Sequence, residues 1–326
     1  MRDGSWALVG TVLLLAACAG PSSSPESVEA ESPGASEGGV ARSASTEIVQ
    51  ALDREPTFTQ GLELLDDGTM LHSRGLYGQS GIDLLSADGT VRRSAELPDQ
   101  EFGEGLTVVP SGALGPDAGP TAYQLTWKSG VVHTWSVPDL VEGPALRIDG
   151  EGWGICFDDT RQVLWQSDGS STLRSLAPAD LSVLETVEVA VQTDGTDPRP
   201  VDQLNELECV EGRVWANVWK SNDVVQIDPD TGAVAAVVDL SVVVQEQAPT
   251  AESDVLNGLA YDDRDGTWVV TGTNWDQLYR LDLVLDGDGG SRVRSQRGSA
   301  ARIGISSVSR PRTAASSGLS GSTVAT

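Results

Sequence analysis

The chain has 326 residues, of which 48 are acidic and 21 basic, and its formal net charge is −27. So acidic a chain offers no phosphate-binding surface, which excludes nucleic acid as an expected partner. With only two lysines and two histidines, a histidine-rich zinc site or a hydrolase triad has little material from which to form.

Residues 1–18 resemble the signal peptide of a bacterial lipoprotein. An apolar run from Trp6 ends in Leu15-Ala16-Ala17-Cys18, and small residues before a cysteine mark a cleavage site just ahead of it. Cys18 would then be the first mature residue, and its lipid would hold the protein on the outer face of the cytoplasmic membrane. The alternatives are an ordinary signal peptide with a chance cysteine, or a membrane anchor, for which the run is short.

The segments that flank the central domain lack the apolar residues of a core. Residues 19–46 are rich in Ser, Pro, Glu, Gly and Ala and predict a disordered tether, whereas 287–326 predict a disordered tail rich in Arg, Ser and Gly. The basic tail could fold back on the acidic domain or contact a cell wall, but a solvated tail is the simpler interpretation. Residues 47–286 remain for a single domain of ample size for a buried core.

Within this domain one short phrase occurs five times. Its copies are Thr59-Gln60-Gly61-Leu62, Gly103-Glu104-Gly105-Leu106, Gly152-Trp153-Gly154-Ile155, Leu204-Asn205-Glu206-Leu207 and Leu256-Asn257-Gly258-Leu259. Successive copies lie 44, 49, 52 and 52 residues apart, a spacing that fits four strands per unit. We therefore predict an all-β, five-bladed β-propeller. The central residues of the five copies should form a ring at one mouth of its channel.

The rest of each unit shows short β-rich runs and turn signals. Examples are the strand Thr121–Trp127 and the turn Ser86-Ala87-Asp88-Gly89. Only Leu240–Gln247 has a trace of helical periodicity, and it is too short to change the fold class.

Cys156 and Cys209 lie near the starts of the third and fourth units. Export would permit a disulfide between them. Each is flanked by apolar residues, however, and a sequence does not show whether two Cα atoms come within bonding reach. We expect two buried free thiols.

Eight segments, in order, resemble the motifs of the plant-type glutaminyl-peptide cyclotransferases, also called glutamine cyclotransferases. They are Phe58–Leu62, Gly75–Ser80, Phe102–Thr107, Tyr123–Trp127, Gly150–Gly154, Asn205–Glu208, Ala216–Trp219 and Asp254–Gly258. The resemblance covers Phe58 to Leu283 and implies a five-bladed propeller that converts the N-terminal glutamine of peptides or proteins to pyroglutamate, with release of ammonia. It implies no catalytic metal and no cofactor. A structural divalent cation in the channel stays an open option, and we expect a monomer that touches the membrane through its lipid alone.

Glu104 is the one ionisable residue of the ring. Cyclisation requires the α-amine to lose a proton and the departing ammonia to gain one, and a single carboxyl group can shuttle both. Neighbouring aromatic residues would raise the pKa of this carboxyl by desolvation. The competing interpretation is a solvated or salt-bridged glutamate at a strand end.

Aromatic and amide residues of the same motifs are the candidate substrate-binding groups. The resemblance implies an aromatic pocket and polar contacts formed by Phe58, Gln60, Phe102, Trp127, Trp153, Asn205 and Trp219. Aromatic walls would exclude water and hold the glutamine curled, while the amides would bind the substrate amide or the developing oxyanion. Ordinary core packing is the alternative for the aromatic residues, and satisfaction of backbone groups for the amides.

One position departs from the family pattern. After Thr271-Gly272 the family places a lysine, and this chain has Thr273, so a cationic contact is missing unless Arg74 or Arg280 reaches in. His72 and Arg74 also stand where the family has an acidic and a small residue. These departures keep a second hypothesis open, a catalytically weak or silent propeller lipoprotein that binds a peptide or sugar.

Overall fold

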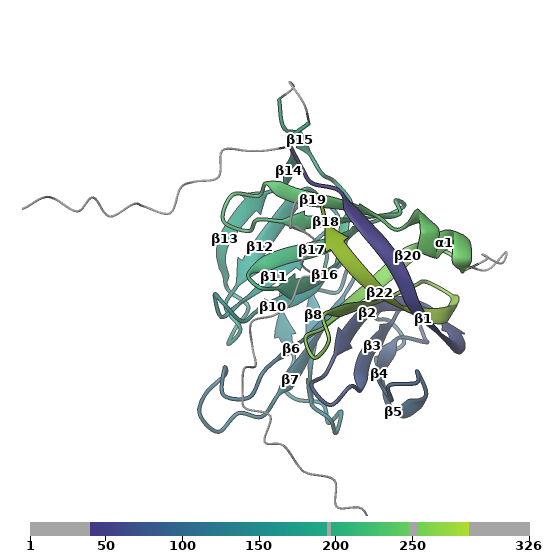
Figure 1. Cartoon of the computed structure of the whole chain (residues 1–326). Helices are drawn as coiled ribbons and strands as arrows, with labels where there is room; N and C mark the ends of the chain where they lie inside the picture. Colours follow the sequence, from purple (N-terminus) through teal and green to yellow (C-terminus); the bar gives the residue numbers. More distant parts are fainter. Residues whose placement is uncertain (1–39, 194–196, 248–252, 287–326) are drawn as a thin grey trace, which may run out of the picture. The chain divides into compact units, whose positions relative to one another are not determined.

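The computed structural model describes residues 40–193, 197–247 and 253–286, which are mostly strands (Figure 1). The predicted signal peptide with Cys18 and the tail 287–326 lie outside these residues. In the part that the structure describes, no helix is both long enough and apolar enough to span a bilayer.

The described strands form five four-stranded antiparallel sheets arranged as a five-bladed propeller, which confirms the predicted fold. Blade 1 contains β2 (Thr59–Leu64), β3 (Met70–Arg74), β4 (Gly81–Leu85) and β5 (Val91–Glu96). Blade 2 contains β6 (Gly103–Val109), β7 (Thr121–Thr126), β8 (Val131–Ser136) and β9 (Leu146–Arg147). Blade 3 contains β10 (Ile155–Asp158), β11 (Val163–Ser167), β12 (Thr172–Leu176) and β13 (Val183–Glu188). Blade 4 contains β16 (Leu204–Val210), β17 (Arg213–Val218), β18 (Asp223–Ile227) and β19 (Val234–Asp239).

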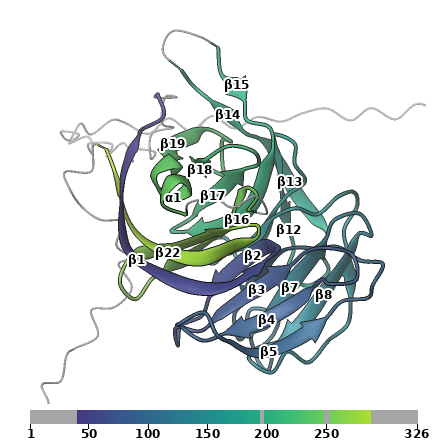
Figure 2. The same ribbon diagram turned by 90° about the vertical axis from the view of Figure 1, so that its right-hand side faces the viewer.

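Blade 5 is assembled from both ends of the domain. It contains β20 (Leu256–Asp262), β21 (Thr267–Gly272), β22 (Trp275–Leu285) and, as its outer strand, β1 (Ala44–Thr57). Figures 1 and 2 show β1 running beside β22, with Ala44 opposite Leu285 and Thr57 opposite Trp275. Strand β1 thus lies before the first copy of the repeat, and it begins three residues before the expected domain start at 47, within the segment predicted to be a tether. Pairing with β22 closes the ring and covers what would otherwise be a free sheet edge.

The core consists of five apolar clusters of described residues, one at each interface between neighbouring blades. Between blades 1 and 5, for example, Leu62 and Met70 pack with Val269 and Leu278. The other four clusters join blades 1 and 2, 2 and 3, 3 and 4, and 4 and 5. Each blade thus buries both of its faces, which explains why the inner strands are buried along almost their whole length and show no alternation of buried and exposed positions.

Glycines of the repeated phrase let the inner strands approach one another around the channel. A Cβ added at Gly105 would lie 2.7 Å from Gly154 Cα, and one at Gly154 would clash with the backbone oxygen of Asn205. Only a residue without a side chain fits such a contact.

Cys156 on β10 and Cys209 on β16 form a disulfide that joins blades 3 and 4, with their Cα atoms 5.4 Å apart. The expectation of two free thiols was wrong. The two inner strands are neighbours around the channel, and that adjacency brings together cysteines 53 residues apart in sequence.

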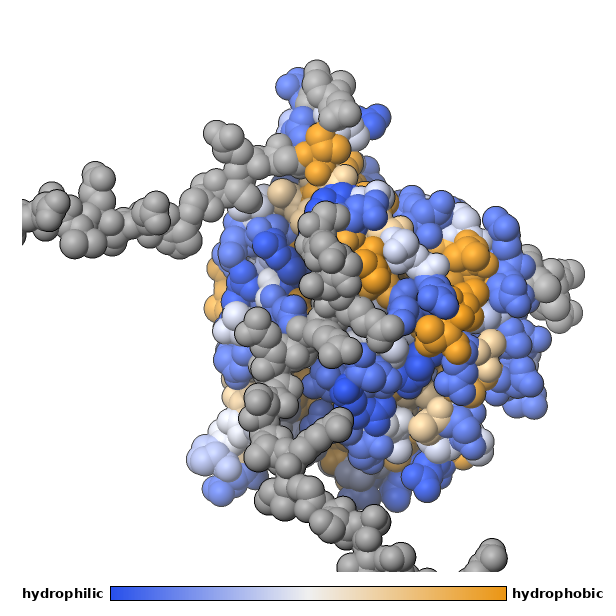
Figure 3. Space-filling view, in the orientation of Figure 1, coloured by the Kyte–Doolittle hydropathy of each residue, from blue (hydrophilic) through white to orange (hydrophobic). Residues whose placement is uncertain are grey.

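The remaining elements lie outside the blades. Helix α1 (Ser241–Glu246) falls within the segment that showed helical periodicity, and β14 (Ala190–Val191) pairs with β15 (Arg199–Pro200) in a small hairpin. On the face shown in Figure 3, hydrophilic residues predominate and hydrophobic ones form separate small patches. Such a surface fits an acidic domain.

Candidate active site

The ring residues coincide with irregularities of the inner strands. The pairing register shifts in β2, β6, β16 and β20 at the positions of Gln60, Glu104, Asn205 and Asn257. A bulge takes a residue out of the ladder and redirects its side chain, which explains how residues on buried strands reach a common point. Trp153 stands just before β10, and its backbone oxygen accepts a hydrogen bond of 2.7 Å from Gly105 N.

Four of the five ring side chains are connected by hydrogen bonds. Asn205 Nδ2 donates to Asn257 Oδ1 over 3.2 Å, and Asn257 Nδ2 donates to Gln60 Oε1 over 2.8 Å. Gln60 Nε2 in turn donates to Glu104 Oε2 over 2.6 Å. The structure thus brings these residues from blades 1, 2, 4 and 5 into one chain that ends at Glu104, while the Trp153 side chain lies outside it.

Glu104 is 5% exposed, and its hydrogen-bond donor is the uncharged amide of Gln60. Burial raises the pKa of this carboxyl well above its ordinary value, and the charge of Glu151 raises it further. Both effects favour the neutral form of Glu104, in which one oxygen can donate a proton while the other accepts one.

Further along the inner strands lie three more glutamates that the sequence analysis did not single out, of which Glu206 and Glu208 are buried and Glu63 is half-buried. Burial raises the pKa of Glu63 to about 8, and burial together with neighbouring carboxyls raises those of Glu206 and Glu208 well above the ordinary value. The Glu206 oxygens accept hydrogen bonds from the backbone of Leu62 and Leu259 and so link β2 to β20. A raised pKa therefore does not distinguish Glu104, whereas its contacts with the ring do.

A cavity of about 1120 Å³ opens at the other ends of the inner strands and is lined by Glu63, Glu208 and Tyr261, among others, but not by Glu104. Among the described residues, no set of three or more His, Cys, Asp or Glu side chains is arranged to hold a metal ion.

The five predicted aromatic residues form two groups. Phe102 makes edge contacts with Phe58 at 5.8 Å and with Trp127 at 5.7 Å between ring centroids, and Trp153 contacts Trp219 in the same way at 5.5 Å. All five are half-buried, whereas the tryptophans of the blade core are fully buried, namely Trp165, Trp215, Trp268 and Trp275. Partial exposure is what a pocket wall requires, and ordinary core packing does not account for it.

Two residues at this site were not among the predicted site residues. Tyr77, 53% exposed, extends the first aromatic group by an edge contact with Phe102 at 5.4 Å. Glu151 Oε2 accepts hydrogen bonds from Trp127 Nε1 at 2.8 Å and from Trp153 Nε1 at 3.1 Å, and so joins the two groups. Both residues lie inside segments that carried the family resemblance, so those segments could have identified them from the sequence.

Thr273 occupies the place of the family lysine. Its side chain is buried, and its hydroxyl donates to Thr59 O over 3.2 Å, an oxygen that also accepts a hydrogen bond from Asn257. Neither arginine that could have replaced the lysine does so. Arg74 pairs with Asp83 and Glu96, and Arg280 pairs with Asp262 and Asp265.

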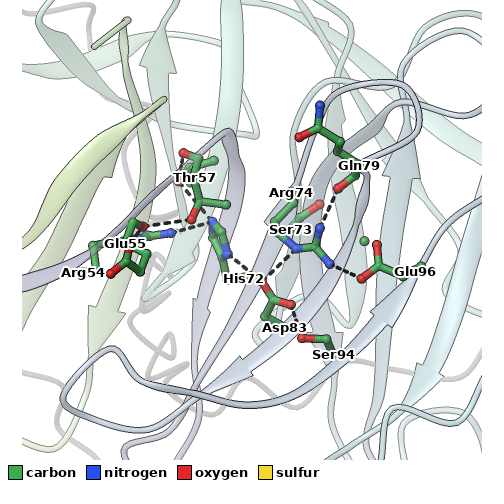
Figure 4. A network of polar contacts seen from close by, with 12 residues as sticks. Arg54, Glu55, Thr57, His72, Ser73, Arg74, Gln79, Asp83, Ser94 and Glu96 are labelled. Carbon is green, nitrogen blue, oxygen red and sulfur yellow. Dashed lines mark hydrogen bonds and ion pairs between the residues drawn. The ribbon is translucent and has the colours of Figure 1, made fainter. Parts of the chain in front are cut away.

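A second buried polar cluster lies where β1 of blade 5 meets blade 1 (Figure 4). We call it the seam network; it comprises Arg54, His72, Arg74, Asp83, Ser94 and Glu96. Asp83 accepts hydrogen bonds from Arg74 Nε at 2.9 Å and from Ser94 Oγ at 2.7 Å, and it lies 3.4 Å from His72 Nδ1. His72 Nε2 lies 3.3 Å from Arg54 Nη2 and 3.0 Å from the hydroxyl of Thr59, the residue before Gln60. His72 thus makes a structural contact between blades through Arg54 of β1, whereas Arg74 pairs within blade 1.

The inner strands of this five-bladed propeller bring one buried carboxyl and three amides together, and this arrangement is the candidate active site of a propeller enzyme. The family model of glutamine cyclotransferases matches residues 13–283, so the chain belongs to that family. It is 32% identical over 242 residues to a glutaminyl-peptide cyclotransferase of Arabidopsis thaliana, covering 73% of this chain and 71% of the plant protein. The crystal structure of Myxococcus xanthus glutaminyl cyclase matches with a TM-score of 0.65 and 31% identity, over 75% of this chain and 99% of the other.

Proposed function

We propose that this protein converts the N-terminal glutamine of peptides or proteins to pyroglutamate with release of ammonia. The enzyme is then an aminoacyltransferase in which one glutamine supplies both the acyl donor, its side-chain amide, and the acceptor, its α-amine. The observation that carries the proposal is the buried carboxyl of Glu104 at the end of the chain of hydrogen-bonded amides.

Glu104 would act as a proton shuttle. The substrate's α-amine attacks Cδ of its own side-chain amide, which forms the C–N bond of the five-membered ring and breaks the bond to the amide nitrogen. One oxygen of Glu104 accepts the proton that the amine loses, while the other donates its proton to the departing nitrogen, so that ammonia leaves and the carboxyl is neutral again. A carboxyl that stays protonated near neutral pH suits this double role.

The pocket residues would bind and orient the substrate. Phe58, Phe102 and Trp127 on one side, and Trp153 and Trp219 on the other, would enclose the side chain of the glutamine and exclude water. Gln60 and Asn205 would donate to the carbonyl oxygen on which negative charge develops. Holding the amine next to the amide carbon contributes to the rate, because the bound substrate no longer has to find the geometry of attack.

The test is ammonia release from a glutamine-initiated dipeptide, with the pyroglutamyl product detected by mass spectrometry. The matched control is the same dipeptide with an acetylated α-amine, which cannot attack. We expect turnover of the first substrate and none of the second. If the free dipeptide binds without any ammonia release, the chain is the silent peptide-binding propeller and the proposal fails.

We also infer an exported, lipid-anchored protein from Leu15-Ala16-Ala17-Cys18 and the polar segment after it. Cys18→Ser should move the protein from the membrane fraction to the soluble fraction. Unchanged partition would contradict lipidation without touching the enzymatic proposal.

The proposal assigns no step to a metal ion and no role to a second subunit. Exhaustive dialysis against EDTA should therefore leave turnover unchanged. A fall in melting temperature at unchanged initial turnover would indicate a structural divalent cation instead. Light scattering should give the mass of a monomer.

A further inference from the structure

Glu151 connects two elements of the aromatic pocket that are otherwise separate. It lies between β9 of blade 2 and β10 of blade 3, and its backbone oxygen accepts a hydrogen bond from Gln166 Nε2 at 3.1 Å. Its side chain is 41% exposed. One carboxylate oxygen, Oε2, receives both indole N–H groups, from Trp127 and Trp153.

We propose that Glu151 is a positioning residue, whose Oε2 holds the indole rings of Trp127 and Trp153 in fixed positions relative to each other. The inference rests on the proposed cyclisation. It adds a residue that acts through its neighbours and does not itself exchange protons with the substrate.

The geometry supports this positioning role. Because both indoles donate to the same oxygen, neither ring can rotate away without losing its hydrogen bond, and the distance between the two walls is set by one carboxylate. Trp127 belongs to the group around Phe102, and Trp153 to the pair with Trp219. Glu151 therefore fixes one aromatic group relative to the other.

A surface ion pair is the competing explanation for Glu151, and it uses the other oxygen. Lys128 Nζ lies 3.8 Å from Glu151 Oε1 and also stands 3.7 Å from the centroid of the Trp127 ring. Exposed ion pairs contribute little to stability. This contact leaves unexplained why two indoles converge on Oε2.

The charge of Glu151 has an additional effect on Glu104. It raises the pKa of Glu104 in addition to the effect of burial, since two like charges in one pocket oppose each other. With the Glu151 charge removed, Glu104 would ionise at lower pH, and the neutral shuttle would be lost earlier as the pH rises.

Two substitutions separate positioning from charge. Glu151→Gln keeps the shape and an acceptor oxygen but removes the charge, whereas Glu151→Ala removes both. Glu142→Gln is the matched control, because Glu142 is a partly exposed carboxylate of the same region that contacts His133 and neither tryptophan. Each variant is characterised by kcat and KM as functions of pH and by the indole N–H resonances of Trp127 and Trp153.

We expect Glu151→Gln to retain kcat/KM at its optimum within about threefold, since a neutral hydrogen bond replaces a charge-assisted one, and to shift the upper limb of the pH profile to lower pH. Glu151→Ala should lose the hydrogen-bonded shift of both indole resonances and lower kcat/KM by about ten- to a hundredfold, the scale of a small misplacement in a site. Glu142→Gln should change neither measurement.

The outcomes are distinguishable. If the wild-type protein cyclises its substrate and Glu151→Gln leaves the upper limb in place, the electrostatic part is wrong. If Glu151→Ala leaves the indole resonances or kcat/KM unchanged, the positioning part is wrong, and in both cases the proposed function stands. A wild-type protein that releases no ammonia overturns the proposed function and this role with it.

Discussion

The ring at the channel mouth and the seam network each bury one carboxyl to the same degree, yet the two carboxyls behave in opposite ways. Glu104 is 5% exposed and Asp83 is 4% exposed. Burial and the charge of Glu151 raise the pKa of Glu104. Burial also acts to raise the pKa of Asp83, but hydrogen bonds with His72 and Ser94 and the charge of Arg74 hold it below its ordinary value. Partners, and not depth, decide which carboxyl stays ionised.

We infer from this difference that Glu104 has a catalytic role and Asp83 a structural one. Asp83, with an arginine beside it, is a fixed negative charge that ties β3, β4 and β5 together within blade 1. Glu104, whose donor is an amide, keeps its proton and can exchange it. If the comparison is correct, removing one carboxyl should damage turnover alone, and removing the other should damage stability alone.

The largest effect is expected from Glu104→Gln. The substitution keeps shape and hydrogen-bonding capacity but cannot shuttle protons, so cyclisation per folded molecule should fall by at least about a hundredfold, within the range of a lost general acid–base. Substrate binding and the melting temperature should be retained. Glu206→Gln is the matched control, because that carboxyl is equally buried but accepts backbone hydrogen bonds. Near wild-type turnover in Glu104→Gln would remove this residue as the catalyst.

The opposite result is expected from Asp83→Asn. Without the carboxylate, Arg74 loses a buried partner, and breaking a buried ion pair costs about 3–5 kcal/mol of unfolding free energy. Urea unfolding measures this loss, and turnover of the molecules that remain folded should be unchanged. Ser94→Ala, which removes one hydrogen bond to Asp83 and no charge, should cost only about 1 kcal/mol. Equal losses in the two variants would show that the charge is not what matters.

The pH dependence of stability sharpens the comparison further. Burial, followed by the charge of Arg54, lowers the pKa of His72 from 6.5 to about 4. Between these values the unfolded chain binds the proton and the folded chain does not. The His72 contribution is therefore fully present above pH 6.5 and falls by about 3 kcal/mol as the pH drops to 4.

The contribution of the channel glutamates to stability changes with pH in the opposite direction. For Glu63 the folded pKa of about 8 lies above the ordinary 4.5, so its protonation adds stability as the pH falls through that range. Comparing wild type with His72→Gln isolates the histidine, because the glutamates are the same in both. Urea unfolding at several pH values should show a shallower loss toward pH 4 in the variant, and identical slopes would contradict the assignment.

The smallest effect is expected at position 273, beside the ring. A lysine there would bring the family's cation close to Thr59 and Asn257, and Thr273→Lys should lower KM or raise the cyclisation rate by about two- to fivefold, the scale of one partly screened charge contact. Thr273→Met is the uncharged control of comparable length. No gain over methionine would mean that the family contact does not apply at this position.

The repeat spacing was sufficient to predict the propeller and the meeting of four of the five ring side chains, because both follow from strand periodicity along the chain. The outer strand of blade 5 was not predicted, since Ala44–Thr57 alternates only between half-buried and exposed positions and lies before the first copy of the repeat. Bonding of Cys156 to Cys209 depends on the placement of β10 beside β16, which local patterns do not contain. For the same reason the double acceptor role of Glu151 became evident only in three dimensions.

The position of β1 has a consequence for the order in which the protein can assemble. The strand made first must pair with the strand made last, and Ala44 faces a residue 241 positions away. Blades 1 to 4 contain mostly contacts between neighbouring strands and can form as the chain emerges, but the ring has no partner for β1 until Trp275–Leu285 is present. Closure is thus a late step with a large loop entropy. Chains that are cut short before β22 would keep four blades and an open edge.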